Sequence, residues 1–305
     1  MFRSVLVALD GSPFGEWALP AALDIARRAG AALELVHVHL VPSRLFTEYR
    51  PNMEVPTDAQ ARERAGSYLD GVARQAGAAG VPVTARLLDG AVPDALLAHA
   101  ADRGADLVVM TTHGRGPLSR FWLGGVADEL LRRLPVPLLL VRPGDGASEL
   151  SRPPALRHVL VPLDGSPLAE QALGPALELG NLTQADYRLL TVIEPLLFAA
   201  DPVTGAQTAA VDDALFQQFQ EEARAYLEGT ARRLRERALD VETRTVIHPH
   251  PAAAILEEAR SIPADLIALA THGRGGLARL LLGSTADKVV RGAVGPVLVY
   301  RPSGG

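Results

Sequence analysis

The chain contains two copies of one sequence pattern, and this internal repeat constrains the fold more than any other feature. The stretch "RSVLVALDGSP" at 3–13 returns as "RHVLVPLDGSP" at 157–167. The word "THGRG" occurs at Thr112–Gly116 and again at Thr271–Gly275, each time inside a longer matching block. Two similar copies of about 145 residues indicate a tandem duplication, because the periods of solenoid repeats are far shorter.

A chain of 305 residues is long for one core and suits two domains. We predict a first domain at 1–143 and a second domain at 156–305. The intervening segment at 144–155 is polar and rich in Gly, Pro and Ser, which is typical of an exposed linker.

Short apolar runs alternate with helical stretches rich in Ala and Leu in each copy. Several of these runs show no polar alternation, which is expected where helices cover both faces of a parallel sheet. We predict an α/β protein with two tandem open, doubly wound, parallel five-stranded sheets and helices on both faces, a Rossmann-like architecture. The predicted strands lie at 4–8, 33–38, 83–88, 106–110 and 137–141, and at 158–162, 187–193, 241–247, 265–270 and 296–300.

The first helix of each copy has a clear start signal. Ser12 and Ser166 are good N-cap residues, and each is followed by proline, which is favoured at the first helical position. We therefore expect helices to begin directly after both serines.

Composition restricts the classes of partner. The net charge of −5 and the pI of about 5.9 argue against nucleic-acid binding. The chain has no cysteine, which removes disulfides and thiolate metal sites. It has no run of about 18 apolar residues, so we expect no membrane span. Asp10 interrupts the apolar start too early for a secretory signal, so we expect a cytoplasmic protein.

The predicted topology indicates where a ligand would bind. Ligands of open α/β sheets lie outside the carboxyl ends of the strands, where the strand order reverses. Asp10 and Asp164 follow the first predicted strands, and the THGRG words follow the fourth. We expect both features of each copy to lie at the same edge of its sheet.

A spaced set of glycines follows the fourth strand of the first copy. Nine residues separate Gly114 from the pair Gly124 and Gly125, which precedes a predicted helix. Glycine lets a ligand approach the backbone, and the amides at a helix N-terminus attract phosphate. We predict a phosphate-binding loop here, to which Arg115 adds a positive charge.

The second copy repeats this spacing with different residues at the helix start. Nine residues separate Gly273 from Gly283, and Arg274 occupies the position of the loop arginine. Ser284 and Thr285 follow, and their hydroxyls can donate to a phosphoryl oxygen. Losing one such donor costs ~1.5–3 kcal/mol, so we expect the second copy to bind phosphate more tightly than the first.

Over nearly its whole length the chain resembles the universal stress protein family. The resemblance rests on "LVALDGSP" and "LVPLDGSP", on "THGRG" followed by "LGG" or "LGST", and on the closing "VPLLLVRP" and "GPVLVYRP". It implies a fold of the adenine nucleotide alpha hydrolase type, and a Gly-x-x-Gly-x9-Gly-Ser/Thr motif that holds ATP phosphates. Thr111 and Ala270 stand where this motif has its first glycine, and Gly125 replaces its hydroxyl residue.

The resemblance also implies roles for residues outside the glycine loop. Asp10 and Asp164 match an acidic residue that faces the ribose and adenine. Val38 and Val192 match a valine whose backbone contacts the adenine. A Gly-x-x-Pro turn matches at Gly90 but reads His248 to Pro251 in the second copy, where the bulkier side chain could crowd the base.

Simpler interpretations compete with these roles. Asp10 and Asp164 could bond loop amides, because Asp before Gly-Ser is a common turn former. For His113 and His272 we expect hydrogen bonds within the loop, since neither has a second ligand at metal-binding spacing. Ser12, Asp10 and His113 do not form a hydrolase triad by sequence, because the nucleophile elbow Gly-x-Ser-x-Gly is missing.

Three functions fit these observations. The first is a nucleotide-binding stress protein that acts by sensing or by presenting a surface to an unknown protein partner, with ATP bound alone or with Mg²⁺. The second is a weak ATPase; the sequence shows no Walker lysine, no evident general base and no pair of magnesium carboxylates, so we expect no efficient enzyme. The third is an interaction module of the same fold that binds no nucleotide.

The resemblance implies an assembly as well. Each copy closes with an apolar strand, "PLLLV" or "PVLVY", which would expose an unpaired edge. In the family, two domains pair antiparallel through this last strand. We expect the two copies to pair in this way within one chain, and we favour a homodimer of whole chains, which the sequence leaves open.

Overall fold

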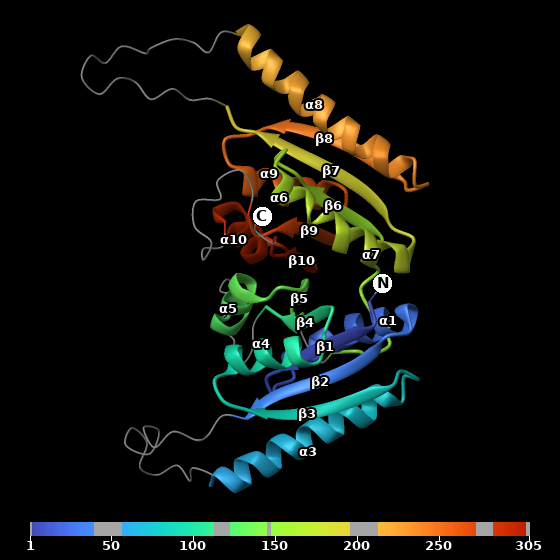
Figure 1. Ribbon diagram of the computed structural model, residues 1–305, viewed down its shortest axis with the longest axis vertical. Helices are drawn as coiled ribbons and strands as arrows, with labels where there is room; N and C mark the ends of the chain where they lie inside the picture. The colour runs from blue at the N-terminus through green and yellow to red at the C-terminus, as the bar shows by residue number, and fades with distance from the viewer. Residues whose placement is uncertain are drawn as a thin grey trace, which may run out of the picture. The chain divides into compact units, whose positions relative to one another are not determined.

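The computed structural model describes residues 2–39, 57–112, 123–144, 148–195, 213–272 and 283–302. The chain divides into two compact units, Met1–Pro154 and Ala155–Gly305. Each unit is an α/β domain, as Figure 1 shows. The predicted fold class is therefore confirmed.

The sheet of the first unit has the order β3-β2-β1-β4-β5, and its paired strands are parallel. The strand order reverses between β1 and β4, so the sheet is doubly wound. Its strands are β1 (Ser4–Leu9), β2 (Ala32–His39), β3 (Val83–Asp89), β4 (Leu107–Thr111) and β5 (Leu138–Val141).

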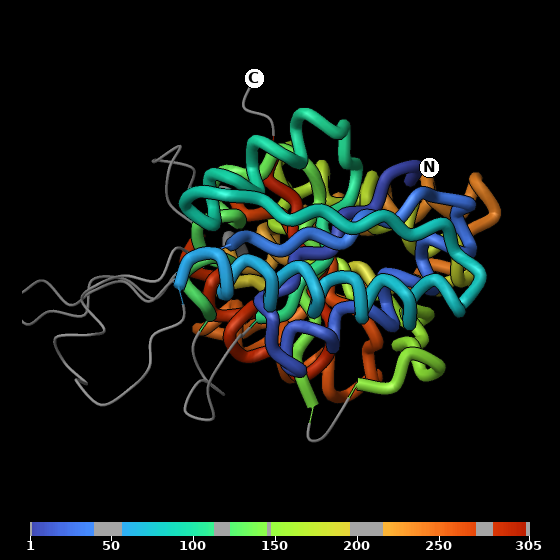
Figure 2. The backbone as a smooth tube through the Cα atoms, turned by 90° about the horizontal axis from the view of Figure 1, so that it is seen from below, coloured from blue at the N-terminus to red at the C-terminus, as the bar shows by residue number. Residues whose placement is uncertain are grey.

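Helices cover both faces of this sheet. Right-handed crossovers place α1 and α3 on one face and α4 and α5 on the other. Figure 2 shows the strands between α3, in light blue, and α4, in teal. The helices are η1, a 3-10 helix (Gly15–Ala18), α1 (Leu19–Ala29), α3 (Asp58–Gly77), α4 (Val92–Asp102) and α5 (Gly125–Arg133).

The second unit repeats this topology. Its sheet has the order β8-β7-β6-β9-β10 and is also parallel. Its strands are β6 (His158–Pro162), β7 (Asp186–Ile193), β8 (Val241–Ile247), β9 (Leu266–Ala270) and β10 (Val297–Tyr300). Its helices are α6 (Pro167–Glu170), α7 (Leu173–Thr183), α8 (Asp213–Arg235), α9 (Pro251–Ser261) and α10 (Ser284–Gly292).

Each predicted apolar run is a strand, with boundaries within one residue of the prediction. The central strands are buried along nearly their whole length: β4 is buried at every position, and β1 at every position after Ser4. This agrees with the absence of polar alternation, because helices remove both faces from water. Within the described ranges, no helix has the length and apolar character needed to cross a membrane.

The prediction for the first helix is correct in one unit and wrong in the other. Ser166 caps α6, and its hydroxyl accepts a hydrogen bond from the Ala169 amide at 3.1 Å. No α-helix begins after Ser12. There the Gly15 amide bonds the Ser12 carbonyl oxygen at 3.0 Å, which closes a turn into η1, and α1 begins at Leu19. The Ser12 hydroxyl accepts a hydrogen bond from the Gly15 amide at 3.3 Å and donates one to the Asp10 carboxylate at 2.7 Å.

Candidate functional site

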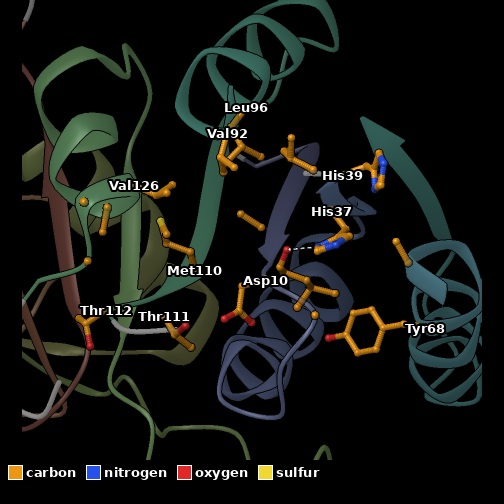
Figure 3. Close-up of a pocket in the computed structure, with 18 of the residues that line it drawn as sticks. Asp10, His37, His39, Tyr68, Val92, Leu96, Met110, Thr111, Thr112 and Val126 are labelled. Atoms are coloured by element: carbon orange, nitrogen blue, oxygen red, sulfur yellow. Dashed lines mark hydrogen bonds between the residues drawn. The ribbon is translucent and has the colours of Figure 1, made fainter. Parts of the chain in front are cut away.

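A cavity of about 740 Å³ opens at the carboxyl edge of the first sheet, where β1, β2 and β4 end. The position is the one expected for a ligand, because the strand order reverses between β1 and β4. Its volume lies within the ~300–1,000 Å³ range of pockets that take small molecules. Figure 3 shows its labelled side chains.

Asp10 supplies a carboxylate to this cavity. Figure 3 places it between Thr111 on one side and Tyr68 on the other. Its Oδ1 accepts hydrogen bonds from the Ser12 amide at 3.0 Å and from the Ser12 hydroxyl at 2.7 Å. The simpler interpretation, a bond to a loop amide, therefore holds for Asp10. The same bonds fix the carboxylate at the cavity wall.

His37 and Val38 bring the end of β2 to the cavity. The His37 Nδ1 lies 2.8 Å from the Leu9 carbonyl oxygen, which can only accept a hydrogen bond, so Nδ1 carries the proton. In the neutral ring Nε2 is then an acceptor. The imidazole packs edge-on against the Tyr68 ring, with the ring centres 6.1 Å apart.

Apolar side chains from both faces of the sheet form a large part of the wall. Ala61 and Ala65 come from α3, Val92 and Leu96 from α4, and Met110 from β4. Figure 3 shows Val92 and Leu96 on the same wall of the cavity. A slot that is apolar on two sides suits a flat aromatic group such as a nucleobase.

The start of α5 forms the remaining side. The Gly124 amide donates to the Thr112 carbonyl oxygen at 3.0 Å, and the Gly124 carbonyl accepts from the Asp128 amide. The next three amides, at 125–127, have no acceptor inside the helix, because helix geometry leaves its first turn unpaired. These residues line the cavity. Together with the helix dipole, they make this end suitable for an anion.

An ionic network lies beside the cavity. The buried His39 side chain contacts Asp58 on α3, with Nε2 and Oδ1 2.8 Å apart. Arg62 binds Asp89 through both oxygens of its carboxylate. The Arg62 guanidinium lowers the pKa of Asp89 and keeps this carboxylate charged. These pairs join the first turns of α3 to the ends of β2 and β3.

The structure brings part of the predicted first site together. Asp10, Val38, Gly124 and Gly125 line one cavity, although they come from three separate segments. Gly90 is absent from its lining; it turns the chain at φ +117°, which favours glycine, and so lets α4 start with Val92 at the wall. The predicted loop residues Gly114 and Arg115 lie outside the described residues, as does His113.

The second unit places its predicted residues at the equivalent ends of its strands and helices. Asp164 follows β6, and its Oδ1 accepts from the Ser166 amide at 2.9 Å. Val192 lies near the end of β7. The next residue toward the N-terminus, Thr191, donates its hydroxyl to the Leu163 carbonyl at 3.0 Å, which is the bond that His37 makes in the first unit.

The phosphate-loop residues of the second unit are described in part. Gly283 precedes α10, and its amide donates to the Thr271 carbonyl oxygen at 2.9 Å. Ser284 and Thr285 are the first two residues of α10, so their amides belong to its unpaired first turn. Gly273 and Arg274 lie outside the described residues.

The turn at His248 differs from its counterpart by more than a side chain. One residue, Gly90, separates β3 from the residue that precedes α4, whereas His248 and Pro249 separate β8 from His250, which precedes α9. The His250 amide donates to His248 Nδ1 at 3.0 Å and closes this turn. Pro93 and Pro251 nevertheless keep the same distance from their strands: Pro93 is the second residue of α4, and Pro251 is the first residue of α9.

The loop histidine of the second unit behaves as expected. Its Nδ1 lies 2.8 Å from the hydroxyl oxygen of Thr271, so His272 makes a hydrogen bond within the loop. Across the described part of the chain, no cluster of three or more His, Cys, Asp or Glu side chains could hold a metal ion.

Several lining residues were missed from the sequence, notably His37, Arg64 and Tyr68. A signal for Tyr68 exists. Ala61, Ala65 and Tyr68 recur at spacings of four and three on α3, which places them on one helix face. The repeat also preserves the tyrosine, because Tyr226 occupies the same position on α8.

Comparison with known proteins gives a consistent result. The sequence model of the universal stress protein family matches residues 1–142 and 155–301. The chain is 33% identical over 204 residues to a universal stress protein of Mycolicibacterium smegmatis, a match that covers 66% of this chain and 64% of that protein. It is 33% identical over 200 residues to a universal stress protein of Mycobacterium tuberculosis. The matches thus span somewhat less than two thirds of these relatives.

Solved structures share the fold over the whole chain. A universal stress protein from Archaeoglobus fulgidus superposes with a TM-score of 0.69 at 19% identity, covering 99% of this chain and 97% of that one. A second, from Pseudomonas aeruginosa, gives 0.67 at 17% identity and covers 99% of this chain and 94% of the other. At this identity the likeness concerns the fold alone.

Proposed function

The chain belongs to the universal stress protein family, and from this premise we propose that it binds an adenine nucleotide in the cavity of its first unit and acts in the stress response. The observation that carries the proposal is the cavity itself. It combines an apolar slot, a fixed carboxylate at Asp10 and the unpaired first-turn amides of α5. Such a site has complementary groups for a base, a ribose and a phosphate.

The proposed chemistry follows from where these groups lie. The amides at 125–127 would receive phosphate oxygens, and the Asp10 carboxylate would accept hydrogen bonds from ribose hydroxyls. The base would lie in the slot between α3 and α4. ATP fits the charge of the helix terminus, with or without Mg²⁺, because both bare and metal-bound phosphates gain from amide donors.

We propose a sensing or protein-binding role rather than turnover. The loop words that flank the cavity contain no Walker lysine, and the cavity wall offers one carboxylate, Asp10, whose Oδ1 already binds Ser12. Phosphate release slower than about one turnover per minute would agree with this role, since typical enzymes turn over at ~1–1,000 per second. Faster release that Asp10→Asn abolishes would favour the ATPase alternative.

Gly125 offers a clean test of the binding site. A Cβ placed there meets no atom within 4 Å, although the residue lines the cavity. Gly125→Val should therefore fill the phosphate end without straining the protein. We expect it to weaken ATP binding, measured by calorimetric titration, by at least about tenfold.

A matched control is available on α3. Gly71 also has open space around its Cβ but does not line the cavity, so Gly71→Val should leave ATP affinity unchanged. Failure of the wild-type chain to bind ATP, ADP or AMP would favour the third function, an interaction module without nucleotide. Analysis of the small molecules released on denaturation identifies the physiological ligand.

We further propose that the two units pair through β5 and β10, as the family resemblance implies, and that whole chains form a homodimer. The absence of native cysteine makes the first point testable without background. Single cysteines introduced at positions along β5 and β10 should form disulfides within one chain in an antiparallel register. Sedimentation would report the chain dimer.

A further inference from the structure

The long helices α3 and α8 correspond residue for residue, which allows their cavity-facing positions to be compared. Tyr68 on α3 matches Tyr226 on α8, and both are followed by a buried leucine, Leu69 or Leu227. The strands that follow, β3 and β8, keep the same spacing from these tyrosines. The correspondence therefore holds for the whole length of helix that reaches the carboxyl edge of each sheet.

The side-chain charge is reversed at one position of this comparison. Arg64, one turn before Tyr68, lines the first cavity, whereas the second unit has Glu222 at the same place. Among the described residues Arg64 forms no ion pair, while its neighbour Arg62 is engaged by Asp89. Glu222 accepts a hydrogen bond from the Gln218 side chain at 2.9 Å. At this helix position the first unit thus has a positively charged side chain without an ion-pair partner among the described residues, and the second unit has a negatively charged side chain.

Neighbouring positions change in the same direction. His39, which lines the first cavity, corresponds to Ile193 at the end of β7. Ala61 corresponds to Phe219, whose side chain is 41% exposed. The edge of the second unit is therefore more apolar as well as more acidic than the edge of the first. Neither change favours an anionic ligand there.

We propose that Arg64 is a specificity-determining residue that makes the first unit the nucleotide-binding half of the chain, and that Glu222 withholds this property from the second unit. The inference rests on the proposed function and deepens it. A cation at the cavity wall attracts a ligand that carries phosphate, and a carboxylate at the same place repels it. Arg64 acts together with the amides of α5, so selection for phosphate comes from two elements of the first unit.

This assignment opposes the ranking that the hydroxyls of Ser284 and Thr285 predict. Those hydroxyls add one or two neutral donors, each of which can be replaced by water. Water cannot replace a reversed charge in this way, because a water molecule supplies no positive charge at the position of Glu222. We therefore expect the first unit to bind ATP more tightly.

Tryptophan fluorescence can separate the two units. The chain has two tryptophans, Trp17 and Trp122, and both belong to the first unit. Trp122 is two residues from Gly124 in sequence. Fluorescence therefore reports binding to the first unit, whereas calorimetry counts ATP bound to the whole chain. We expect the wild-type chain to bind one ATP in the micromolar range or tighter, with the same affinity by both methods.

The charge-reversal variant Arg64→Glu tests the role of the cation. It should weaken ATP binding by about tenfold or more and adenosine binding by less than about threefold, because only ATP carries phosphate. Arg74→Glu is the matched control, since it makes the same change on an exposed position of α3 that does not line the cavity. Equal losses for Arg64→Glu and Arg74→Glu, or equal losses for ATP and adenosine, would overturn the inference.

The reciprocal variant Glu222→Arg tests the second unit. It should produce additional ATP binding in calorimetry without a matching change in tryptophan fluorescence. An unchanged titration would contradict the assignment of this helix position. Two equal ATP sites in the wild-type chain would also overturn it. These results differ from the failure of the proposed function, in which the wild-type chain binds no adenine nucleotide by either method.

Discussion

The Gly283 amide donates a hydrogen bond to the Thr271 carbonyl oxygen at 2.9 Å, and a Cβ on Gly283 would lie 2.8 Å from that same oxygen. Gly124 makes the equivalent bond to Thr112 at 3.0 Å. In each unit the carbonyl of the threonine that begins the THGRG word therefore binds the amide of the glycine that precedes the next helix. In the second unit this close approach explains why the loop ends on a glycine.

The two glycines should differ in their tolerance of a side chain. We expect Gly283→Ala to lower the free energy of unfolding by about 1–3 kcal/mol, because its Cβ would press on a backbone oxygen. Gly124→Ala should cost less than about 1 kcal/mol, since its Cβ would lie 3.5 Å from Thr112, an ordinary contact. Urea unfolding followed by circular dichroism measures both. The opposite order would show that the loop closure relaxes more easily in the second unit.

The two units connect equivalent strands to equivalent helices through side-chain pairs in which the carboxylate lies on opposite elements. In the first, Glu34 on β2 contacts His99 on α4 at 2.9 Å. In the second, Arg188 on β7 contacts Glu258 on α9 at 2.9 Å. Both carboxylates are nearly buried, with 10% of each side chain exposed, so an unpaired or like charge would be costly.

We expect Arg188→Glu to destabilise the second unit by about 3 kcal/mol or more, because three carboxylates would then meet at 188, Glu242 and Glu258. Adding Glu258→His rebuilds the pair found in the first unit and should recover part of the loss. A double-mutant cycle by chemical unfolding gives the coupling. If the double variant is no more stable than Arg188→Glu, the pairing does not depend on polarity.

Tyr187 should make stability depend on alkaline pH. Its hydroxyl is buried and has no hydrogen-bond partner among the described residues, and burial raises the pKa of Tyr187 to about 12 from 10.0. A raised pKa means that this group contributes stability below pH 10, which is lost as the pH rises toward 12. At about pH 11 the loss amounts to about 1.4 kcal/mol.

Tyr187→Phe should remove this dependence. At neutral pH we expect no loss of stability, and a gain of up to about 1 kcal/mol, because the variant buries no unpaired hydroxyl. Urea unfolding at neutral and at alkaline pH, compared between the wild type and the variant, provides the measurement. A loss of more than about 1 kcal/mol at neutral pH would reveal a partner for the hydroxyl.

The loop arginines Arg115 and Arg274 lie outside the described residues, and their role stays a prediction from the sequence. If either binds phosphate, its replacement by alanine should weaken ATP by ~1–2 kcal/mol and leave adenosine unaffected. Under the inference about Arg64, the larger effect belongs to Arg115. Equal losses for ATP and adenosine would argue against a phosphate role.

The sequence alone determined the duplication, the fold class and the strands of this protein. The repeat predicted two units, and the continuous apolar runs predicted buried parallel strands. Both patterns can be recognised in the sequence without knowing which residues are in contact. Asp10, Val38, Gly124 and Gly125 were also found in advance, since the ends of parallel strands must meet at one edge of the sheet.

Only the tertiary structure decided which residues surround the cavity and what holds them in place. His37 reaches the cavity through its bond to Leu9, 28 positions away in sequence, and Arg64 reaches it because α3 lies along the sheet edge. The start of α1 at Leu19, after η1, was likewise not predicted from the sequence. The positions of His37 and Arg64 depend on contacts between segments far apart in the sequence, which local patterns do not contain. The late start of α1 instead follows from the short turn that the Gly15 amide closes on Ser12.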